Sequence, residues 1–305
     1  MDYINYKLYF PNEDLSMRIS GNYVVRVYPE GNREKPILSA CFSVMEPQAT
    51  IRLEASSQTD IGANRTYQQV SFDVNYTNNR ISPMQDLKVY VLQNNRRDNW
   101  GDLLKPLNIQ NGRLTYAHNP KLIFEAGNEY RKFEVISYRY NGLGIASIEW
   151  HAPYYHVDIR ADQVRAGKTY SYDEDIDGKF FIRSQDGVEH DTESDYFFAH
   201  FYLPCDKPFN DDVYLLSEIF NNIADERSKM EYSVNDGGYV KTLLLKQGHY
   251  NYMYVTKKSG TSTLSPALIE GNYFQTSNEY TVYVYYRPIG ARYDSLIGFQ
   301  YLLFH

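Results

Sequence analysis

The chain has 305 residues, which is enough for two or three domains, and its net charge is −7 at pH 7. No basic stripe runs between its aromatic residues, so the composition argues against a nucleic-acid partner. No stretch approaches the roughly 20 consecutive apolar residues of a membrane helix, so no transmembrane segment is predicted.

The composition favours β-structure. Tyrosine occurs 31 times and phenylalanine 15 times, and both residue types favour pleated, half-buried surfaces. The sequence has no long run of good helix formers. We therefore predict an all-β fold.

The first strand patterns lie near the start of the chain. Residues 20–28 (SGNYVVRVY) alternate between two faces, residues 36–46 are predicted to pair with them as a hairpin, and residues 6–10 (YKLYF) are predicted as another strand. These strands are too few for a sandwich of about 100 residues, so residues 1–46 are predicted to form a partial immunoglobulin-like module. The opening residues lack a basic region followed by an apolar one, so we expect no signal peptide within them.

Two longer series of strands follow. We predict a β-sandwich module over residues 47–158 and an immunoglobulin-like β-sandwich over residues 159–305. The main predicted strands are 69–77, 87–93, 112–117, 132–140, 145–151, 196–203, 212–218, 238–245, 250–256 and 279–287. Residues 215–226 fit either a strand that ends at an Asn–Asn turn or a helix, and we prefer the strand. The expected architecture is a series of immunoglobulin-like β-sandwich modules, the first truncated.

One stretch resembles half of a metal loop. In YDEDIDGKF (172–180), Asp173, Asp175 and Asp177 are followed by a glycine, as in the first half of a calcium loop. That loop needs a glutamate at its twelfth position, where this chain has Ser184. A solvated hairpin tip is the competing interpretation, and we prefer it. The three aspartates are therefore a weak calcium candidate, and no metal is predicted.

The motifs of common enzyme classes are missing from the sequence. It contains no G-x-S-x-G elbow, no H-E-x-x-H helix and no glycine-rich phosphate loop. Carboxylate pairs for glycoside hydrolysis can lie far apart in a chain, so a hydrolase with dispersed carboxylates stays open as an alternative. We predict that the protein is not an enzyme and uses no cofactor.

Residues 213–256 resemble the glycogen-binding type of immunoglobulin-like module. The residues that carry this resemblance are Phe220, Asn221, Asn222, Met230, Gly237, Gly238, Leu243, Gly248, Tyr250 and Tyr252. The chain departs from that pattern where sugar is bound, because the expected tryptophans are replaced by Ile223 or a neighbour and by Tyr239–Val240. The resemblance therefore implies the fold more than the activity.

A second resemblance covers nearly the whole chain. The segment FPNEDLSMRISGNYVVRVYPEGNREKPILSACFSVME, the segment YNYMYV and the run from Glu270 to Arg292, which contains EGNYF, NEYTV and VYYRP, are similar to the plug proteins of the Bacteroidetes type IX secretion system. This resemblance implies a periplasmic, multi-module β protein without enzymatic activity. It also implies a partner, the outer-membrane translocon barrel, whose periplasmic mouth the plug closes.

These observations lead to one expected function and one rival. We expect a non-catalytic periplasmic accessory protein, associated with the outer membrane, that binds the translocon barrel and has no small-molecule ligand. Because interfaces favour arginine and aromatic anchors, we predict that Arg287, Pro288, Arg292 and Tyr293 bind the partner. The rival is a glycan-binding protein of the periplasm or cell surface that would use coplanar aromatic rings of the third module.

Overall fold

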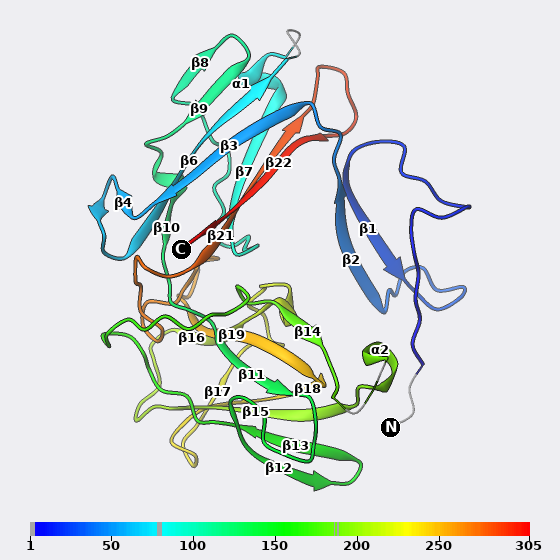
Figure 1. The fold of residues 1–305 in the computed structure, drawn as a ribbon, viewed down its shortest axis with the longest axis vertical. Coiled ribbons are helices and arrows are strands. Elements are labelled where there is room, and N and C mark those ends of the chain that lie inside the picture. The colour runs from blue at the N-terminus through cyan, green and yellow to red at the C-terminus, as the bar shows by residue number, and fades with distance from the viewer. Residues whose placement is uncertain (1–3, 78–80, 186, 188) are drawn as a thin grey trace.

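The computed structural model describes residues 4–77, 81–185, 187 and 189–305, and it places them in three parts (Figure 1). The hairpin arm comprises residues 4–46. The upper lobe contains strands β3 to β10 together with β21 and β22, and the lower lobe contains β11 to β20. The chain passes between the lobes twice, through residues 126–130 and 266–277, and we call this pair of segments the crossover.

The upper lobe is a sandwich of two sheets. Its elements are β3 (Ala49–Ser56), β4 (Gln58–Thr59), β5 (Gly62–Ala63), β6 (Tyr67–Tyr76), α1 (Pro83–Asp86), β7 (Leu87–Gln93), β8 (Asn108–Gln110), β9 (Arg113–Tyr116), η1 (Pro120–Leu122), β10 (Ile123–Glu125), β21 (Asn278–Tyr286) and β22 (Ser295–Phe304). One sheet is built around β6, which pairs with β3, β9 and β10, and the other has the order β22-β21-β7. Alternate residues of β6 and β21 fill one core, where Phe72, Tyr280 and Val282 are buried.

The lower lobe is a second sandwich. Its elements are β11 (Arg131–Val135), β12 (Ile145–His151), β13 (Tyr154–Ile159), β14 (Phe180–Ile182), α2 (His190–Glu193), β15 (Tyr196–Pro204), β16 (Asp212–Leu216), η2 (Glu218–Phe220), β17 (Glu231–Ser233), β18 (Gly238–Lys246), β19 (Gly248–Lys257) and β20 (Leu264–Ser265). One sheet has the order β12-β13-β15-β18-β17, and in the other β19 pairs with β11, β14, β16 and β20. Aromatic residues dominate the core between them, where Phe133 packs on Phe201 and Tyr250.

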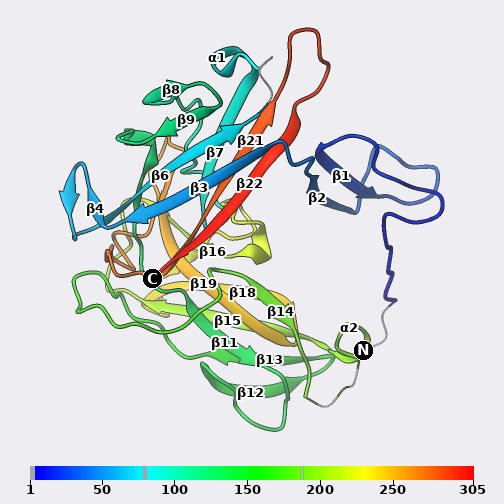
Figure 2. The same cartoon turned by 45° about the horizontal axis from the view of Figure 1, so that its top comes forward.

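The hairpin arm projects from the side of the two lobes (Figures 1 and 2). Its strands are β1 (Gly21–Val27) and β2 (Leu38–Val44), which pair only with each other in the part of the chain that the structure describes. Lys7 forms a salt bridge of 3.0 Å with Asp191 of the lower lobe. Residues 6–10 form no strand, so the prediction there was wrong, because alternation alone does not supply a pairing partner.

The sequence predicts modules that follow one another along the chain, but the structure assigns several strands to the other lobe. Residues 278–304, which the prediction placed in the third module, pair with β7 and pack in the upper core. Residues 131–158, which it placed in the second module, pack in the lower core. Alternation shows that a segment is a strand but not which sheet receives it. The lower lobe is therefore inserted into the upper one.

Two further predictions concern single elements. Residues 212–216 form strand β16, which confirms the strand interpretation for Leu215 and Leu216. The strand ends there, however, and the short 3₁₀ helix η2 (Glu218–Phe220) precedes the left-handed Asn221 and Asn222. Both α-helices in the described part of the chain are four residues long. No helix in the described ranges has the length and apolar character that crossing a membrane requires.

The division into lobes predicts where core substitutions act. Val282→Ala should leave a cavity in the upper core and lower the free energy of unfolding by about 2 kcal/mol, because Val282 is fully buried. Amide hydrogen exchange measured by mass spectrometry should then rise in β6 and β7 and stay unchanged in β15 and β18. The matched variant Val213→Ala, in the lower core, should give the reverse pattern. Exchange that rises in β15 for Val282→Ala would contradict the division.

Candidate functional site

The predicted partner-binding residues lie together on the turn between β21 and β22. Arg287, Arg292 and Tyr293 are exposed, and Pro288 is half-buried. The backbone N–H of Arg287 donates to the carbonyl of Asp86, which ties the base of the turn to α1. Neither arginine forms a salt bridge with another described residue. The guanidinium of Arg287 donates to the carbonyl of Ala291 at 3.4 Å within the turn, and both arginine side chains are exposed to solvent.

The same turn also exposes a large apolar side chain that the sequence analysis did not select. Ile289 is 90% exposed at its tip. Gly290, the next residue, has a φ of 87°, a conformation that glycine adopts at little cost. A single exposed apolar side chain is ordinary on a protein surface, so Ile289 bears on binding only together with the aromatic surface that adjoins the turn.

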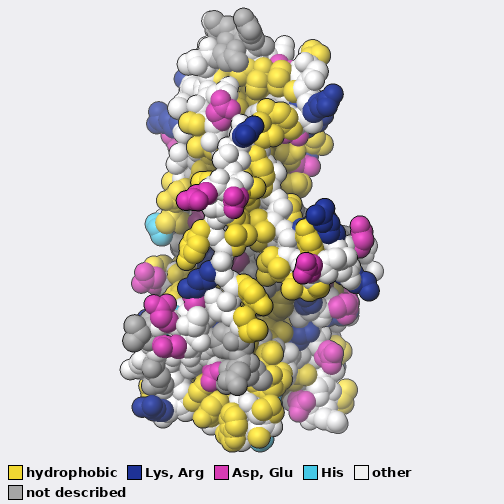
Figure 3. Space-filling model, turned by 90° about the vertical axis from the view of Figure 1, so that its right-hand side faces the viewer, with side chains coloured by type: hydrophobic (Ala, Val, Ile, Leu, Met, Phe, Trp, Pro, Cys, Tyr) yellow, Lys and Arg dark blue, Asp and Glu magenta, His cyan; other side chains and the backbone are white. Residues whose placement is uncertain are grey.

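An aromatic surface continues from the turn along the outer side of the sheet β22-β21-β7. Tyr283 of β21 packs on Phe299 of β22 with ring centroids 5.2 Å apart, and Tyr301 follows on the same side. Phe299 and Tyr301 are more than one-third exposed. Figure 3 shows hydrophobic side chains gathered in a band down the side of the molecule from which the hairpin arm projects, with lysine and arginine beside it. We call the surface formed by Tyr283, Phe299 and Tyr301, together with the turn 287–294, the docking face.

The hairpin arm closes one end of the docking face into a pocket. Tyr285 donates a hydrogen bond of 2.9 Å to the side-chain oxygen of Asn22, and Ser43 donates one of 2.8 Å to the same oxygen. The cavity between the arm and the sheet has a volume of about 260 Å³. The residues that line it are Asn22, Ser43, Lys88, Tyr90, Leu92, Asn95, Arg97, Trp100, Tyr283, Tyr285 and Asp294. Sequence reasoning missed Arg97 and Trp100, because their loop follows β7 and carries no motif.

The calcium candidates are not brought into one site. The carboxylate of Asp173 is exposed and pairs with Lys132 at 2.6 Å. Both oxygens of Asp175 accept backbone N–H groups, from Tyr130 and Asp177. Within the described residues, no group of three or more His, Cys, Asp or Glu side chains is arranged to hold a metal ion. Asp175 thus holds the backbone of its own loop at Asp177 and ties the loop to Tyr130 of the crossover.

The positions expected to bind sugar in the lower lobe serve the structure instead. Tyr239 is buried, and its hydroxyl accepts the N–H of Phe209 at 2.7 Å, so its ring cannot serve as a stacking platform. The turn after η2 faces the upper lobe, where the side chain of Asn222 donates to the carbonyl of Asn94 at 3.3 Å. The Asn–Asn turn that supports the glycogen-binding resemblance therefore helps to join the lobes.

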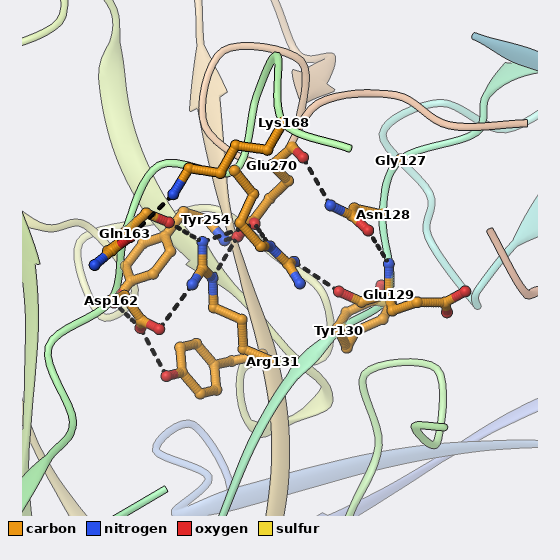
Figure 4. Close-up of polar contacts among 12 residues, drawn as sticks. Gly127, Asn128, Glu129, Tyr130, Arg131, Asp162, Gln163, Lys168, Tyr254 and Glu270 are labelled. Atoms are coloured by element: carbon orange, nitrogen blue, oxygen red, sulfur yellow. Dashed lines mark hydrogen bonds and ion pairs between the residues drawn. The ribbon is translucent and has the colours of Figure 1, made fainter. Parts of the chain in front are cut away.

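The most densely paired charges lie at the crossover (Figure 4). Glu270 is fully buried, and its carboxylate accepts N–H groups from Arg131 at 3.0 and 2.9 Å, from Arg165 at 2.6 Å and from the backbone of Tyr254 at 2.8 Å. Burial acts to raise the pKa of Glu270, but the two guanidiniums outweigh it and hold the pKa below its ordinary value. Glu270 thus stays charged inside the protein.

Further contacts connect this cluster to both crossover segments. Arg131 donates to Asp162 at 2.8 Å, and Asp162 in turn accepts the hydroxyl of Tyr254 at 2.8 Å. Asn128 of the first segment donates to the backbone carbonyl of Glu270 in the second at 2.9 Å. Glu270, Arg131, Arg165 and Asp162 are thus paired with one another, and the cluster joins the crossover to the lower lobe.

The half-buried Asp177 of the loop 172–180 predicts a pH dependence. Burial raises the pKa of Asp177 to about 6, and one of its oxygens is buried without a hydrogen-bond partner. A carboxyl group with a raised pKa favours the folded state only while it is protonated. The contribution of Asp177 to the free energy of unfolding is therefore fully present below about pH 4 and is lost as the pH rises through 6. At pH 8 the charged carboxylate of Asp177 therefore lowers the free energy of unfolding, and in acid it does not.

Asp177→Asn should remove this cost. The amide carries no charge to bury, and asparagine tolerates the φ of 53° at this position. We expect the free energy of unfolding to rise by on the order of 2 kcal/mol at pH 8 and to change little at pH 4, measured by urea denaturation. The matched substitution Asp206→Asn at an exposed position should leave both values unchanged. Equal effects of Asp177→Asn at the two pH values would contradict the assignment.

Comparisons with known proteins agree with the sequence resemblance. Residues 1–46 match the family described as type 9 secretion system plug protein, 1st domain. The chain is also similar to a hypothetical protein from Parabacteroides merdae ATCC 43184, whose crystal structure has a TM-score of 0.94 to this one at 48% sequence identity. The similarity covers 97% of this chain and 75% of that one. Curated proteins provide no match.

The hairpin arm thus matches the first domain of the plug proteins, and the near-complete structural match extends through both lobes. The segment EGNYF, which carries the sequence resemblance, lies in the second segment of the crossover and contains the buried Glu270. The chain belongs to the type IX secretion system plug protein family.

Proposed function

We propose that this protein is a non-catalytic periplasmic component of type IX secretion that binds the outer-membrane translocon barrel through its docking face. Membership of the plug family supports a role in that secretion system. The single observation that carries the docking role is the turn 287–294 between β21 and β22, where Arg287, Ile289, Arg292 and Tyr293 are exposed. Arginine and tyrosine are among the residues that contribute most to binding at interfaces.

The arrangement of charged groups supports a role without catalysis. Of the two buried acids of the crossover, Glu270 is paired with two arginines, and Glu129 accepts the hydroxyl of Tyr170 and the N–H of Ser277 through one of its oxygens. In the lower lobe, the half-buried Asp162 pairs with Arg131 and two tyrosine hydroxyls, and the half-buried Asp175 accepts two backbone N–H groups. A hydrolase would need two carboxylates facing one open cleft, and these acids instead satisfy neighbouring groups of the protein.

Glycan binding is the second candidate, at a different place from the one that the sequence suggested. The ring planes of Tyr283 and Tyr285 differ by only 19°, with centroids 6.4 Å apart, and Asn22 and Asn95 line the same pocket. Parallel rings beside amides can hold a sugar. Tyr285 is only 9% exposed, however, and its hydroxyl is already bonded to Asn22. This leaves little ring surface for stacking, so we favour the protein partner.

The docking role predicts that substitutions on the turn abolish binding without unfolding the protein. The full chain, tagged and incubated with detergent-solubilised outer membrane from its native organism, should recover the translocon barrel, identified by mass spectrometry. The double substitution Arg292→Glu and Tyr293→Ala should reduce recovery by at least tenfold, because it reverses a charge and removes an aromatic anchor.

Arg227→Glu makes the same charge change on an exposed residue of the lower lobe and should recover the barrel as the unmodified chain does. Circular dichroism should show that both variants remain folded. If the unmodified chain recovers no barrel, the docking role is wrong. If instead it binds soluble glucans or cell-surface glycans in isothermal titration, the glycan-binding function replaces it.

A further inference from the structure

The pocket under the hairpin arm contains a positive charge without a partner. Lys88 is neutralised by Asp294, since its ammonium lies 3.0 Å from the carboxylate. Arg97 is exposed and forms no salt bridge or side-chain hydrogen bond with any residue in the described ranges. Burial raises the pKa of Tyr283 and of Tyr285, and Arg97 opposes this rise, which shows that its charge acts at both hydroxyls. The pocket is locally cationic in a protein whose net charge is −7.

The remaining free polar groups of the pocket are mostly hydrogen-bond donors. The indole of Trp100 can only donate, and the guanidinium of Arg97 carries five N–H donors in a planar fork that matches a carboxylate. Neither these two side chains nor Asn95 makes a side-chain hydrogen bond within the described chain. The carboxylate of Asp294 is already used by Lys88. A ligand that fits this pocket must therefore bring acceptors and negative charge.

An apolar surface lies beside these donors. Trp100 is 40% exposed, and its ring packs on Tyr90 with centroids 5.1 Å apart. Tyr283 adds a second ring from the neighbouring strand β21. Aromatic rings of this kind accept a leucine, phenylalanine or similar side chain by packing, in the way that interface anchors do. The pocket thus combines an anion-binding group with an apolar platform.

The size of the pocket favours a short peptide segment. Its volume of about 260 Å³ lies below the roughly 300–1,000 Å³ of sites that enclose a whole small molecule. One or two side chains of an extended segment fill such a space. The walls come from β7, β21, the loop after β7 and the hairpin arm, so the site exists only while the arm is folded onto the sheet.

We propose that this pocket binds an acidic peptide segment of the docking partner, in which an aspartate or glutamate pairs with Arg97 and an adjacent apolar side chain packs on Trp100 and Tyr283. This inference rests on the proposed docking function and specifies the chemistry of the partner. The positive charge and the donors select the acidic side chain, and the exposed ring of Trp100 with the half-buried ring of Tyr283 selects its apolar neighbour. The polar side of the hairpin arm contributes Asn22 and Ser43 to the same site.

Trp100 supplies a direct readout, because the chain has only two tryptophans. In the full chain with Trp150→Phe, all tryptophan emission comes from Trp100. Titration with the peptide Ac-Gly-Leu-Asp-Leu-Gly-NH₂ at low salt should change this emission saturably. The peptide with asparagine in place of aspartate should bind at least tenfold more weakly, and added salt should weaken the aspartate peptide because the contact is ionic.

Arg97→Gln should weaken the aspartate peptide at least tenfold, and Arg227→Gln, which removes the same charge from the lower lobe, should leave its affinity unchanged. Equal affinities of the two peptides, or an unchanged affinity for Arg97→Gln, would overturn the proposal. So would binding of oligogalacturonate, an anionic glycan, without binding of the peptide.

The outer-membrane recovery experiment separates this proposal from the docking function. If Arg97→Gln still recovers the translocon barrel at the level of the unmodified chain and the peptide does not bind, the pocket assignment fails and the docking function stands. If the unmodified chain recovers no barrel, the docking function fails, and with it the assignment of the peptide to that partner. A loss of recovery for Arg97→Gln, together with selective binding of the acidic peptide, supports both.

Discussion

The buried carboxylate of Glu270 is the contact on which the arrangement of the two lobes depends. The chain leaves the upper lobe through residues 126–130 and returns through residues 266–277, which contain Glu270. Asn128 of the first segment donates to the backbone carbonyl of Glu270, and Arg131, directly after that segment, donates to its carboxylate. An ionised carboxylate without water is costly unless every lone pair is satisfied. Here Arg131, Arg165 and a backbone N–H satisfy it, so only one geometry of the crossover avoids that cost. These contacts hold the two segments of the crossover, which connect the lower sandwich to the upper one, in one arrangement.

This joint has consequences for the surface that we assign to docking. Strand β21 follows the second crossover segment directly, and its inward side chains fill the upper core while its outward tyrosines line the docking face. The turn 287–294 is thus held to the crossover by one continuous strand. The hairpin arm is attached to both lobes, through Asn22 to Tyr285 above and through Lys7 to Asp191 below. A rigid surface loses little conformational entropy on binding, which favours affinity.

Much of the local structure could be predicted from the sequence, and little of the long-range structure could. Alternation identified the strands that contain residues 20–28, 69–77 and 279–287, since burial on one face of a strand has a period of two. It could not show that residues 278–304 return to the upper lobe, because both cores accept the same apolar pattern.

The exposed turn with Arg292 and Tyr293 was selected from residue types alone. Arg97 and Trp100 were missed, because only the folded hairpin arm brings them into a pocket. The aspartates of residues 173–177 had half of a calcium spacing, but backbone donors occupy Asp175.

Urea unfolding of Glu270→Gln, followed separately in each lobe, tests most directly whether this joint makes the two lobes one body. Trp100 reports on the upper lobe in a Trp150→Phe background, and Trp150 reports on the lower lobe in a Trp100→Phe background. With Glu270 intact, the two emissions should change in one coincident transition. With Glu270→Gln, two arginines lose a buried partner, which should lower the free energy of unfolding by about 3–5 kcal/mol. The two transitions should then separate. The control Glu54→Gln, at an exposed position, should keep them together. Coincident transitions of undiminished stability in Glu270→Gln would contradict the account.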